Sequence, residues 1–520
     1  MTESKHQLVH HFLEHAAAAQ PDKTAVIHDG ARYTYTDIDR CAGQFASWLI
    51  GQGVKKGDRV LVLLFNGVEY VVSYYGAMKA GAIPVSLSTG ITAEGLRPII
   101  DELGPAACVT SKRFEDVFIQ CVPASAGIKN ILVKSPEKSW PGGISAVSWD
   151  DVVGGSEIRP VRVDVAATDL AGIIYTSGST GTPKGVMLTH ANIASNVASI
   201  CEYLRLTDKD IQMAVLPFFY VMGKSLLNTH FAAGGTVVIN NRFAFTAAVL
   251  KEMSDLEVTG FSGVPSTYAY LLHRSPLLKY RDKMPNLRYC SQAGGHMARQ
   301  IKEDLRKALP PHTEIYIMYG ATEASARLTY LEPEKFSEKI DSIGRAIPGV
   351  TMRILGEDGT ELPAGQVGEL AGSGPNIMQG YWKDEELSRK VLDSNGYHTG
   401  DLGYKDEEGY LYLVGRKDNL LKVGGHRINP QEIEDSIVES GLVVETAVIG
   451  VPDHLLGNRL VAVTVPIEQN CTAENILSHC VQVLPKYKVP SEILFVRSLP
   501  KKESGKIDRA GCKRFIKPLP

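Results

Sequence analysis

The segment "YTSGSTGTPKG", Tyr175–Gly185, gathers glycines, hydroxyl side chains and one lysine. Glycine permits positive φ, hydroxyls compete for backbone hydrogen bonds, and Pro183 removes a backbone donor. We therefore expect neither a packed strand nor a helix here. Two interpretations are open: a surface loop, or a nest of backbone N–H groups that cradles phosphate. The common phosphate-loop pattern needs Ser or Thr after its lysine, but Gly185 follows Lys184, so a phosphate site here is of another kind.

Two further segments carry carboxylates where a ligand could bind. "YGATE", Tyr319–Glu323, follows the apolar strand "EIYIM" and presents an aromatic ring, a hydroxyl and a carboxylate. Open α/β sheets place ligands at such strand ends. "GYHTGD" ends in Asp401, whose carboxylate could accept two hydrogen bonds from a ribose diol. Each has a simpler alternative, because Glu323 could be a solvated carboxylate and Asp401 a turn former.

Two C-terminal segments supply glycines and cations. "KVGGHRINP" contains Gly424, Gly425 and Arg427, and "PKKESGKIDR" contains Lys506 on a polar loop. Arg427 could instead belong to a surface ion pair, and Lys506 to a solvated basic face. The chain has no GxSxG elbow, which gives a hydrolase triad no support.

Alternating strands and helices must position these residues. "YTDIDRCAGQFASWLIGQG" predicts a helix that Thr36 can cap, since its apolar residues share one face. The following strand, helix and strand, "RVLVLLF", "GVEYVVSYYGAMKAG" and "AIPVSLS", predict a βαβ unit and a parallel sheet. The glycine-rich segment lies between the strand "AGIIYT" and the helix "THANIASNVASICEYL", which is a phosphate-site context.

The pattern of predicted secondary structure changes twice toward the C-terminus. After Pro348, β-prone runs alternate with turns, and from Asn429 a compact pattern of helices and strands begins. We predict an α/β fold: a large N-terminal domain of stacked, helix-covered sheets plus a β-rich subdomain, and a small mobile α+β C-terminal domain. The predicted domains are residues 1–417 and 418–520, with the linker near Gly415–Asn419.

Composition excludes several classes of protein. The 520 residues are 44% hydrophobic and 22% charged, and the net charge of −3 does not favour nucleic-acid binding. No apolar run approaches the roughly 18 residues of a membrane span, and the N-terminal segment lacks the apolar core of a signal peptide. The eight cysteines are scattered without a CxxC pair, which indicates neither a zinc site nor a disulfide framework. We expect a cytoplasmic protein.

Taken together and in order, these segments resemble a known superfamily. "YTSGSTGTPKG", "YGATE", "YHTGD", "GRKDNLLKVGGHRINP" and "PKKESGKIDR" are similar to the signatures of adenylate-forming enzymes. That group includes acyl-CoA synthetases, peptide-synthetase adenylation domains and beetle luciferase, and the resemblance spans nearly the whole chain. It implies that a carboxylic acid reacts with ATP to give acyl-AMP and pyrophosphate, and that the acyl group then passes to a thiol. Catalysis would consist mainly of positioning and charge neutralisation.

The resemblance also implies the nucleotide site. The glycine-rich segment would hold the β- and γ-phosphates, Tyr319 would stack on adenine, and Asp401 with Arg416 would grip the ribose. Glu323 and Thr180 would hold Mg²⁺. The implied ATP-binding residues are Thr176, Ser177, Gly178, Ser179, Thr180, Gly181, Lys184, Gly294, Gly295, His296, Tyr319, Gly320, Ala321, Asp401 and Arg416.

Catalysis in the resembled family involves domain alternation. A terminal lysine, Lys506 here, enters the site in one pose, and a glycine loop, Gly424 and Gly425 here, opens a thiol tunnel in the other. Asp418 matches the hinge. The implied catalytic residues are Lys506, Glu323, Thr322 and Arg427.

The acid is less well defined by the sequence. Amino-acid-activating relatives usually carry an aspartate, and many acyl- and aryl-CoA synthetases a histidine, where this chain has Tyr220 in "LPFFYVMGKS". An uncharged aromatic there suggests an acid without an α-ammonium group, although Tyr220 could also simply pack in the core. Ser262, Gly263 and Val264 are small and would leave room for an alkyl chain.

We therefore expect ATP-dependent activation of a fatty or medium-chain acid, or next an aryl or small branched acid. The acceptor would be coenzyme A or the phosphopantetheine of a separate acyl carrier protein. The alternative is a stand-alone amino-acid or aryl-acid adenylating enzyme that loads a carrier protein. A luciferase-like oxygenase and a non-catalytic binding protein are rivals of other classes; the presence of Lys506, Glu323 and Asp401 argues against the second. The sequence does not determine the chain length of the acid, the thiol that accepts the acyl group, the oligomeric state or the pathway.

Overall fold

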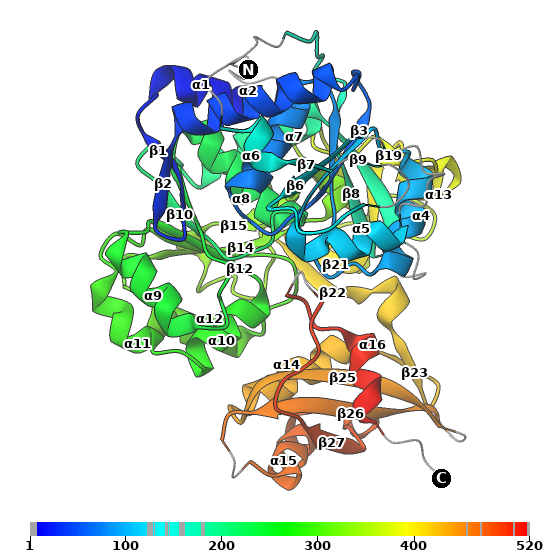
Figure 1. The fold of residues 1–520 in the computed structure, drawn as a ribbon. Coiled ribbons are helices and arrows are strands. Elements are labelled where there is room, and N and C mark those ends of the chain that lie inside the picture. Colours follow the sequence, from blue (N-terminus) through cyan, green and yellow to red (C-terminus); the bar gives the residue numbers. More distant parts are fainter. Residues whose placement is uncertain are drawn as a thin grey trace.

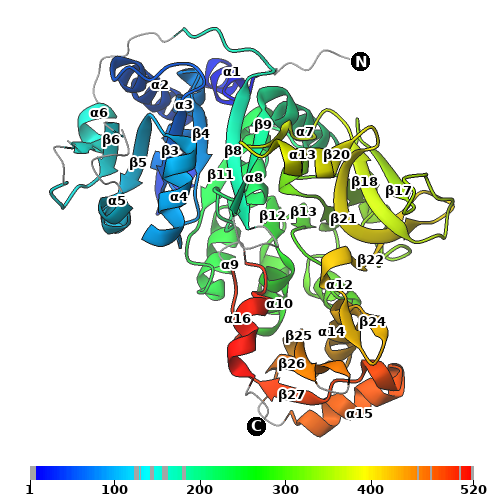
Figure 2. The same cartoon turned by 90° about the vertical axis from the view of Figure 1, so that its right-hand side faces the viewer.

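The computed structural model describes residues 8–121, 128, 130–140, 144, 146–154, 162–177, 183–453, 456–468, 471–502 and 505–516. A large N-terminal domain of several sheets carries a small C-terminal domain at one end (Figure 1). In the second view, the sheets of the large domain lie side by side above the C-terminal domain (Figure 2). The predicted α/β fold class is confirmed.

The first sheet contains the predicted βαβ unit. Strands β3 (Arg59–Leu63) and β4 (Ile83–Ser86) pair in parallel, and α3 (Val68–Lys79) connects them. The sheet has five strands in the order β4-β3-β5-β6-β7. Its other elements are α4 (Ala93–Leu103), β5 (Ala107–Ser111), α5 (Glu115–Cys121), β6 (Asn130–Lys134), β7 (Ala146–Ser148) and α6 (Trp149–Val152).

Helix α2 (Tyr35–Gly51) has its N-cap two residues earlier than the sequence suggested. Thr34, not Thr36, is its N-cap: the Thr34 hydroxyl accepts from the backbone N–H of Asp37 at 3.1 Å. The Asp37 carboxylate in turn accepts from the backbone N–H of Thr34 at 2.9 Å, which completes a capping box. Thr36 instead donates its hydroxyl to the carbonyl of Pro21 at 3.0 Å, so the prediction of a Thr36 cap was wrong.

The second sheet has nine strands in the order β16-β15-β14-β13-β12-β10-β11-β1-β2 and is parallel from β14 to β1. Within it, β10 and β11 pair in parallel and α8 connects them. Its strands are β1 (Thr24–His28), β2 (Ala31–Thr34), β10 (Ile211–Ala214), β11 (Thr236–Ile239), β12 (Gly260–Gly263), β13 (Tyr289–Gln292), β14 (Glu314–Tyr319), β15 (Thr329–Leu331) and β16 (Arg345–Ala346). The helices that precede or connect them are α1 (His11–Ala19), α7 (His190–Tyr203), α8 (Val221–Ala233), α9 (Thr246–Asp255), α10 (Pro265–His273), α11 (Leu277–Tyr280) and α12 (Arg299–Ala308).

The glycine-rich segment joins two strands rather than a strand and a helix. β8 (Leu170–Ser177) pairs antiparallel with β9 (Pro183–Thr189), and α7 follows β9. The expectation that Tyr175–Gly185 contains no strand was therefore wrong, because both of its ends lie in this hairpin. β19 (Gly380–Tyr381) adds a third strand beside β9.

A β-rich subdomain follows, as predicted. Its sheet contains β17 (Thr351–Leu355), β18 (Gly368–Ser373), β20 (Leu392–Asp393), β21 (Gly396–Lys405) and β22 (Leu411–Arg416), accompanied by α13 (Glu385–Val391). The C-terminal domain is built from β23 (Leu421–Val423), β24 (His426–Ile428), α14 (Pro430–Glu439), β25 (Val443–Asp453), β26 (Gly457–Pro466), α15 (Ala473–Val483), β27 (Glu492–Phe495) and α16 (Arg509–Cys512). These helices and strands match the pattern predicted for the end of the chain.

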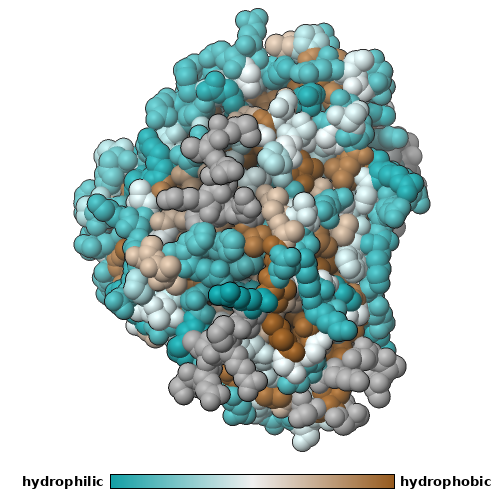
Figure 3. Space-filling view, turned by 90° about the horizontal axis from the view of Figure 1, so that it is seen from above, coloured by the Kyte–Doolittle hydropathy of each residue, from teal (hydrophilic) through white to brown (hydrophobic). Residues whose placement is uncertain are grey.

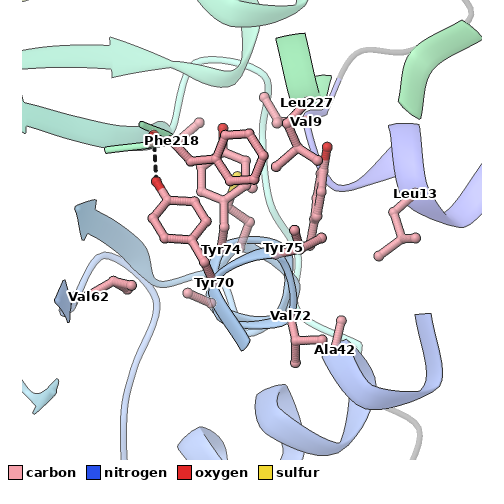
Figure 4. Close-up of a cluster of buried hydrophobic side chains, with 14 of the residues drawn as sticks. Val9, Leu13, Ala42, Val62, Tyr70, Val72, Tyr74, Tyr75, Phe218 and Leu227 are labelled. Atoms are coloured by element: carbon pink, nitrogen blue, oxygen red, sulfur yellow. Dashed lines mark hydrogen bonds between the residues drawn. The ribbon is translucent and has the colours of Figure 1, made fainter. Parts of the chain in front are cut away.

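The main core lies between the first two sheets and is rich in aromatic residues. Tyr75 of α3 stacks on Phe231 of α8 with ring centroids 5.2 Å apart. Tyr70, one turn earlier on α3, faces Phe218 and donates its hydroxyl to the Phe218 carbonyl at 2.7 Å (Figure 4). Because Tyr70 is 1% exposed, this polar group depends on protein partners alone.

The surface opposite the C-terminal domain is mostly hydrophilic, with apolar patches between the polar side chains (Figure 3). Among the helices in the described part of the chain, none combines the length and the apolar character that crossing a membrane requires.

Replacing Tyr70 with Phe should lower the free energy of unfolding by about 1–3 kcal/mol, because the Phe218 carbonyl and Ser86 would lose their buried partner. Urea unfolding followed by circular dichroism measures this change. Tyr487→Phe is the control, since Tyr487 is 42% exposed. Equal midpoints for the two variants would contradict the role of the Tyr70 hydroxyl.

Candidate active site

The candidate site lies where the carboxyl ends of parallel strands meet. β12, β13 and β14 pair side by side, so Gly263, Gln292 and Tyr319 end at one edge of the nine-stranded sheet. The segments that follow these strands contain the predicted residues Val264, Gly294, Gly295, His296, Gly320, Ala321, Thr322 and Glu323. This edge is where open α/β sheets bind ligands.

Tyr319 and Asp401 come together from different sheets. The Tyr319 hydroxyl donates to Asp401 Oδ2 at 2.6 Å, and Arg416 Nε lies 3.2 Å from Asp401 Oδ1. β21 and β22 place Asp401 opposite Arg416 in the register, which explains the ion pair. Burial raises the pKa of Asp401 while Arg416 and Tyr319 act against it, and burial also raises the pKa of Tyr319. Asp401 is thus a buried carboxylate held by one cation and one hydroxyl.

The turn after Tyr319 is tight and strained. A Cβ at Gly320 would collide with the carbonyl oxygen of Ala326, so only glycine fits. Ser325 and Ala326 have φ values of 55° and 123°, a region that costs non-glycine residues energy. Between them and Gly320, Ala321 precedes a short 3₁₀ helix, Thr322–Ala324, in which Thr322 is buried. The strain fixes the direction in which Thr322 and Glu323 point.

Glu323 and Lys184 meet at Tyr381. The Tyr381 hydroxyl donates to Glu323 Oε1 at 2.8 Å, and Lys184 Nζ lies 5.8 Å from the centre of the Tyr381 ring. Burial first, and then the Glu323 charge, raise the pKa of Tyr381, so its hydroxyl remains a donor. The predicted metal ligand and the predicted phosphate lysine therefore belong to one cluster.

The tip of the glycine-rich loop lies outside the described residues. This applies to Gly178, Ser179, Thr180 and Gly181, and to the side chain of Ser177. At the base of the loop, Thr176 on β8 is in register with Lys184 on β9. The roles predicted for the loop tip, including that of Thr180 toward Mg²⁺, stay predictions.

Lys506 of the C-terminal domain reaches this site. Its Nζ lies 5.5 Å from the centre of the Tyr220 ring, and its Cε lies 3.6 Å from the position of a Cβ at Gly294. The preceding residue anchors the loop, because the Gly505 carbonyl accepts from the Ser266 hydroxyl at 2.7 Å. The Lys506 charge also acts to lower the pKa of Asp401. The structure thus brings Lys506 together with Tyr220, Gly294 and Asp401.

The predicted acyl-pocket residues do not all share one environment. Val264 is buried in an apolar cluster with Met222 and Met318, and half-buried Tyr220 packs against the same cluster. Ser262, in contrast, pairs its hydroxyl with that of Ser291 at 2.7 Å inside the sheet. A Cβ at Gly263 would press on the side chain of Thr267, so this glycine permits close packing of α10. Of the predicted acyl-pocket residues, the structure thus brings Val264 and Tyr220 together in one apolar cluster, while their role toward the acid stays a prediction.

Other predicted residues lie at or beyond the domain interface. His296 Nε2 is 2.9 Å from Asp435 Oδ2 on α14, and Gly295 packs against Pro265. Gly424 and Gly425 form the exposed turn between β23 and β24, and Arg427 is exposed on β24. The backbone of Asp418 lies in the 3₁₀ turn Lys417–Asn419, and its side chain is outside the described residues. The contacts of Lys506 described above include none of Gly424, Gly425 and Arg427.

Three contacting residues escaped the sequence reasoning. Tyr381 holds Glu323, Ser266 holds the Lys506 loop, and Asp435 pairs with His296. Each contacts a residue distant in the chain. Tyr381 and Asp435 lie outside the segments that the sequence singled out for their chemistry, whereas Ser266 stands two residues after Val264 of the predicted acyl pocket.

The chain belongs to the AMP-binding enzyme family: the AMP-binding enzyme domain matches residues 13–382, and the AMP-binding enzyme C-terminal domain matches residues 432–506. The resemblance inferred from the motifs is thereby confirmed. Strand-end residues of a large domain faced by a lysine from a small one are the arrangement that this resemblance implied.

Relatives cover almost the whole chain. A 2-succinylbenzoate–CoA ligase of Bacillus cereus (strain AH820) is 30% identical over 98% of this chain and 98% of its own. A long-chain-fatty-acid–CoA ligase of Salmonella typhimurium is 28% identical over 97% of this chain and 94% of its own. The solved structure of O-succinylbenzoate coenzyme A synthetase from Bacillus subtilis, in complex with ATP and magnesium ion, has a TM-score of 0.80 at 27% identity and covers 96% of this chain and 98% of that one. The acids named for these relatives differ.

Gly320→Ala should lower the rate of acyl-AMP formation by about 10²-fold, since the added methyl group displaces the turn that orients Thr322 and Glu323. ATP–pyrophosphate exchange measures this step. Gly51→Ala is the matched control, because a Cβ there meets nothing within 4 Å. Unchanged exchange in the Gly320 variant would show that the turn tolerates displacement.

Proposed function

We propose that the protein joins a carboxylic acid to ATP, releases pyrophosphate, and transfers the acyl group from acyl-AMP to a thiol. The observation that carries this proposal is the position of Lys506: a lysine of the C-terminal domain lies between Tyr220 and Gly294, within electrostatic reach of Asp401. In this pose the two domains together supply one site.

The chemistry requires cations at this place. In the first step a carboxylate oxygen attacks the α-phosphorus of ATP, the bond to the bridging oxygen breaks, and pyrophosphate leaves. Both reactants are negatively charged and repel each other. Their negative charge must therefore be neutralised in a site that excludes water. Lys506 supplies charge on the side of Tyr220, and Lys184 supplies it beside Tyr381. In the second step the thiol attacks the acyl carbon and AMP leaves.

The residues present suit a nucleotide and a divalent ion. Asp401 would accept hydrogen bonds from the ribose hydroxyls. Its Oδ1 has Arg416 as a partner and its Oδ2 has Tyr319, and each carboxylate oxygen can accept a second hydrogen bond. Glu323 would hold Mg²⁺, because carboxylate oxygens are the ligands that this ion prefers and Tyr381 engages only Oε1. When bound, Mg²⁺ would neutralise phosphate charge. Support comes from the relative whose structure contains ATP and magnesium ion.

A change of domain pose would separate the two steps. The C-terminal domain meets the large domain through contacts that include the Ser266–Gly505 hydrogen bond, at the loop of Lys506, and the His296–Asp435 pair, at α14. Rotation at Asp418, with residues 1–417 and 418–520 as the moving bodies, would withdraw Lys506. The exposed turn of Gly424 and Gly425 would then line the thiol path, and Arg427 would move with it.

For the acid, we propose an alkyl carboxylic acid of fatty or medium length. The cluster beside Tyr220 is apolar: Leu216, Met222, Leu226 and Val264 are all buried there. One relative is named as a ligase for long-chain fatty acids.

A second candidate is an acid that carries another anionic group. Arg327 is 3% exposed and lies against the same cluster, where its Nε donates to Met318 Sδ at 3.1 Å. It makes no ion pair with a carboxylate among the described residues, and an unpaired buried charge is costly. The 2-succinylbenzoate named for another relative has two carboxylates. An α-ammonium group beside Tyr220 is disfavoured, because the positive charge of Arg327 reaches Tyr220 and would repel the ammonium group.

We propose coenzyme A as the acceptor, since both curated relatives described above are CoA ligases; a phosphopantetheinyl carrier protein is the alternative. We also propose a reducing compartment such as the cytoplasm, because all eight cysteines, which lie in the described part of the chain, are free.

Lys506→Ala should lower acyl-AMP formation by at least about 10²-fold yet leave acyl transfer from supplied acyl-AMP nearly unchanged. Separate assays of pyrophosphate release and thioester formation measure the two steps. Lys513→Ala, an exposed lysine of the same domain, is the control. Equal loss of both steps in the Lys506 variant would refute the change of domain pose.

Acid-dependent ATP–pyrophosphate exchange should identify the substrate. Fatty, aryl, dicarboxylic and amino acids are compared in one panel, with alkyl acids expected to be fastest. Arg327→Met separates the two candidates, because it should spare alkyl acids and slow dicarboxylic acids by tenfold or more. Fastest exchange with an amino acid would overturn the interpretation of Tyr220.

A further inference from the structure

The N-terminal helix carries a cluster of potential metal ligands that the proposed function does not use. α1 begins directly after His10, and Glu14 follows one turn later. One ligand atom from each of His10, His11 and Glu14 lies within 4.8 Å of the others. Helix geometry explains why Glu14 lies beside both histidines, since residues three and four positions apart lie beside one another on the helix surface.

The buried imidazole of His10 is the second observation. His10 is 7% exposed, and its Nδ1 has no hydrogen-bond partner among the described residues. Buried polar groups nearly always have such a partner. The neighbouring His190 ring lies edge to face with His10, with centroids 5.6 Å apart, and its Nδ1 accepts the backbone N–H of Val9 at 3.0 Å. An unpaired imidazole nitrogen beside two other ligands suits a cation.

Neighbouring side chains hold the ligands in place. The rings of His10 and His11 contact edge to face, with centroids 4.9 Å apart, so the two imidazoles lie side by side. Glu14 Oε1 lies 2.8 Å from Lys79 Nζ, which fixes the carboxylate, and Lys79 also lies 2.8 Å from Asp39. The second acidic partner offsets the Lys79 charge, and Oε2 of Glu14 remains for coordination.

We propose that His10, His11 and Glu14 bind one divalent transition-metal ion, with Zn²⁺ as the first candidate. Imidazoles with one carboxylate suit Zn²⁺, whereas Mg²⁺ prefers oxygen ligands throughout. Three protein ligands leave a fourth tetrahedral position for water. α1 lies at the end of the large domain far from the C-terminal domain, so this ion is distinct from the one at Glu323 (Figure 1).

Such an ion would attach the start of the chain to the core. α1 buries Phe12, Leu13 and Ala16 and packs against α8 and α2. A ligand that binds only the folded state stabilises it in proportion to the logarithm of its concentration. We therefore expect Zn²⁺ to raise the melting temperature reversibly.

Calorimetric titration of the untagged, nucleotide-free full chain with ZnCl₂ tests the proposal. One equivalent should bind, EDTA should reverse the thermal shift, and MgCl₂ should not compete. His10→Gln, His11→Gln and Glu14→Gln should each weaken binding by tenfold or more. His15→Gln is the matched control on the same helix, because His15 is exposed and outside the cluster.

Three outcomes would overturn the site: no saturable binding of Zn²⁺, unchanged affinity in Glu14→Gln, or an equal loss in His15→Gln. Glu14→Gln decides the matter if the buried His10 variant fails to fold, since the Glu14 side chain is 36% exposed. Anomalous diffraction at the zinc edge should place the ion beside α1.

Discussion

The central constraint on this molecule is electrostatic: a carboxylate must approach a phosphorus atom that already carries negative charge. The necessary cations come from two places. Lys184 belongs to a hairpin of the large domain, whereas Lys506 belongs to a separate domain, where the carbonyl of the neighbouring Gly505 accepts from the Ser266 hydroxyl. A lysine of the large domain would meet the same electrostatic need but could not be withdrawn. A lysine of a separate domain could be withdrawn between the two steps of the proposed reaction, which need different surroundings.

The large domain has the opposite property, because its part of the site is rigid. Gly320 packs against the Ala326 carbonyl, and Ser325 and Ala326 accept unfavourable backbone conformations. Such strain persists only where the surrounding packing imposes it. Here the packing comes from the strands that end at this edge and from the buried Tyr319–Asp401 contact. The large domain thus supplies a rigid part of the site, to which Lys506 adds a charge from a separate domain.

Much of this could be predicted from the sequence, but not the contacts between distant segments. The βαβ units follow from buried apolar runs, and the order of Tyr319, Asp401 and Lys506 follows from the signature segments. Tyr381 was missed because its role depends on β19 lying beside β9, a pairing across almost two hundred positions that no local pattern encodes. Thr36 was chosen over Thr34 because both hydroxyls precede the helical pattern, and only the Asp37 capping box distinguishes them. The strand "AGIIYT" before the glycine-rich loop was predicted and corresponds to β8, whereas β9 was missed because it opens with Pro183 and Gly185, residue types that are depleted in strands.

Strand geometry separates the choice of acid from the handling of ATP. Successive residues of β14 face opposite sides, so Tyr319 contacts Asp401 on the nucleotide side while Met318 packs on the other side with Arg327 and Tyr203. Under the proposed function, a substitution at Arg327 would therefore change the charge near the acid without altering a residue that would touch ribose or phosphate. Relatives that share this architecture are named for quite different acids, a fatty acid and a succinylbenzoate among them. The two-sided strand gives a physical reason why such divergence can leave the nucleotide site intact.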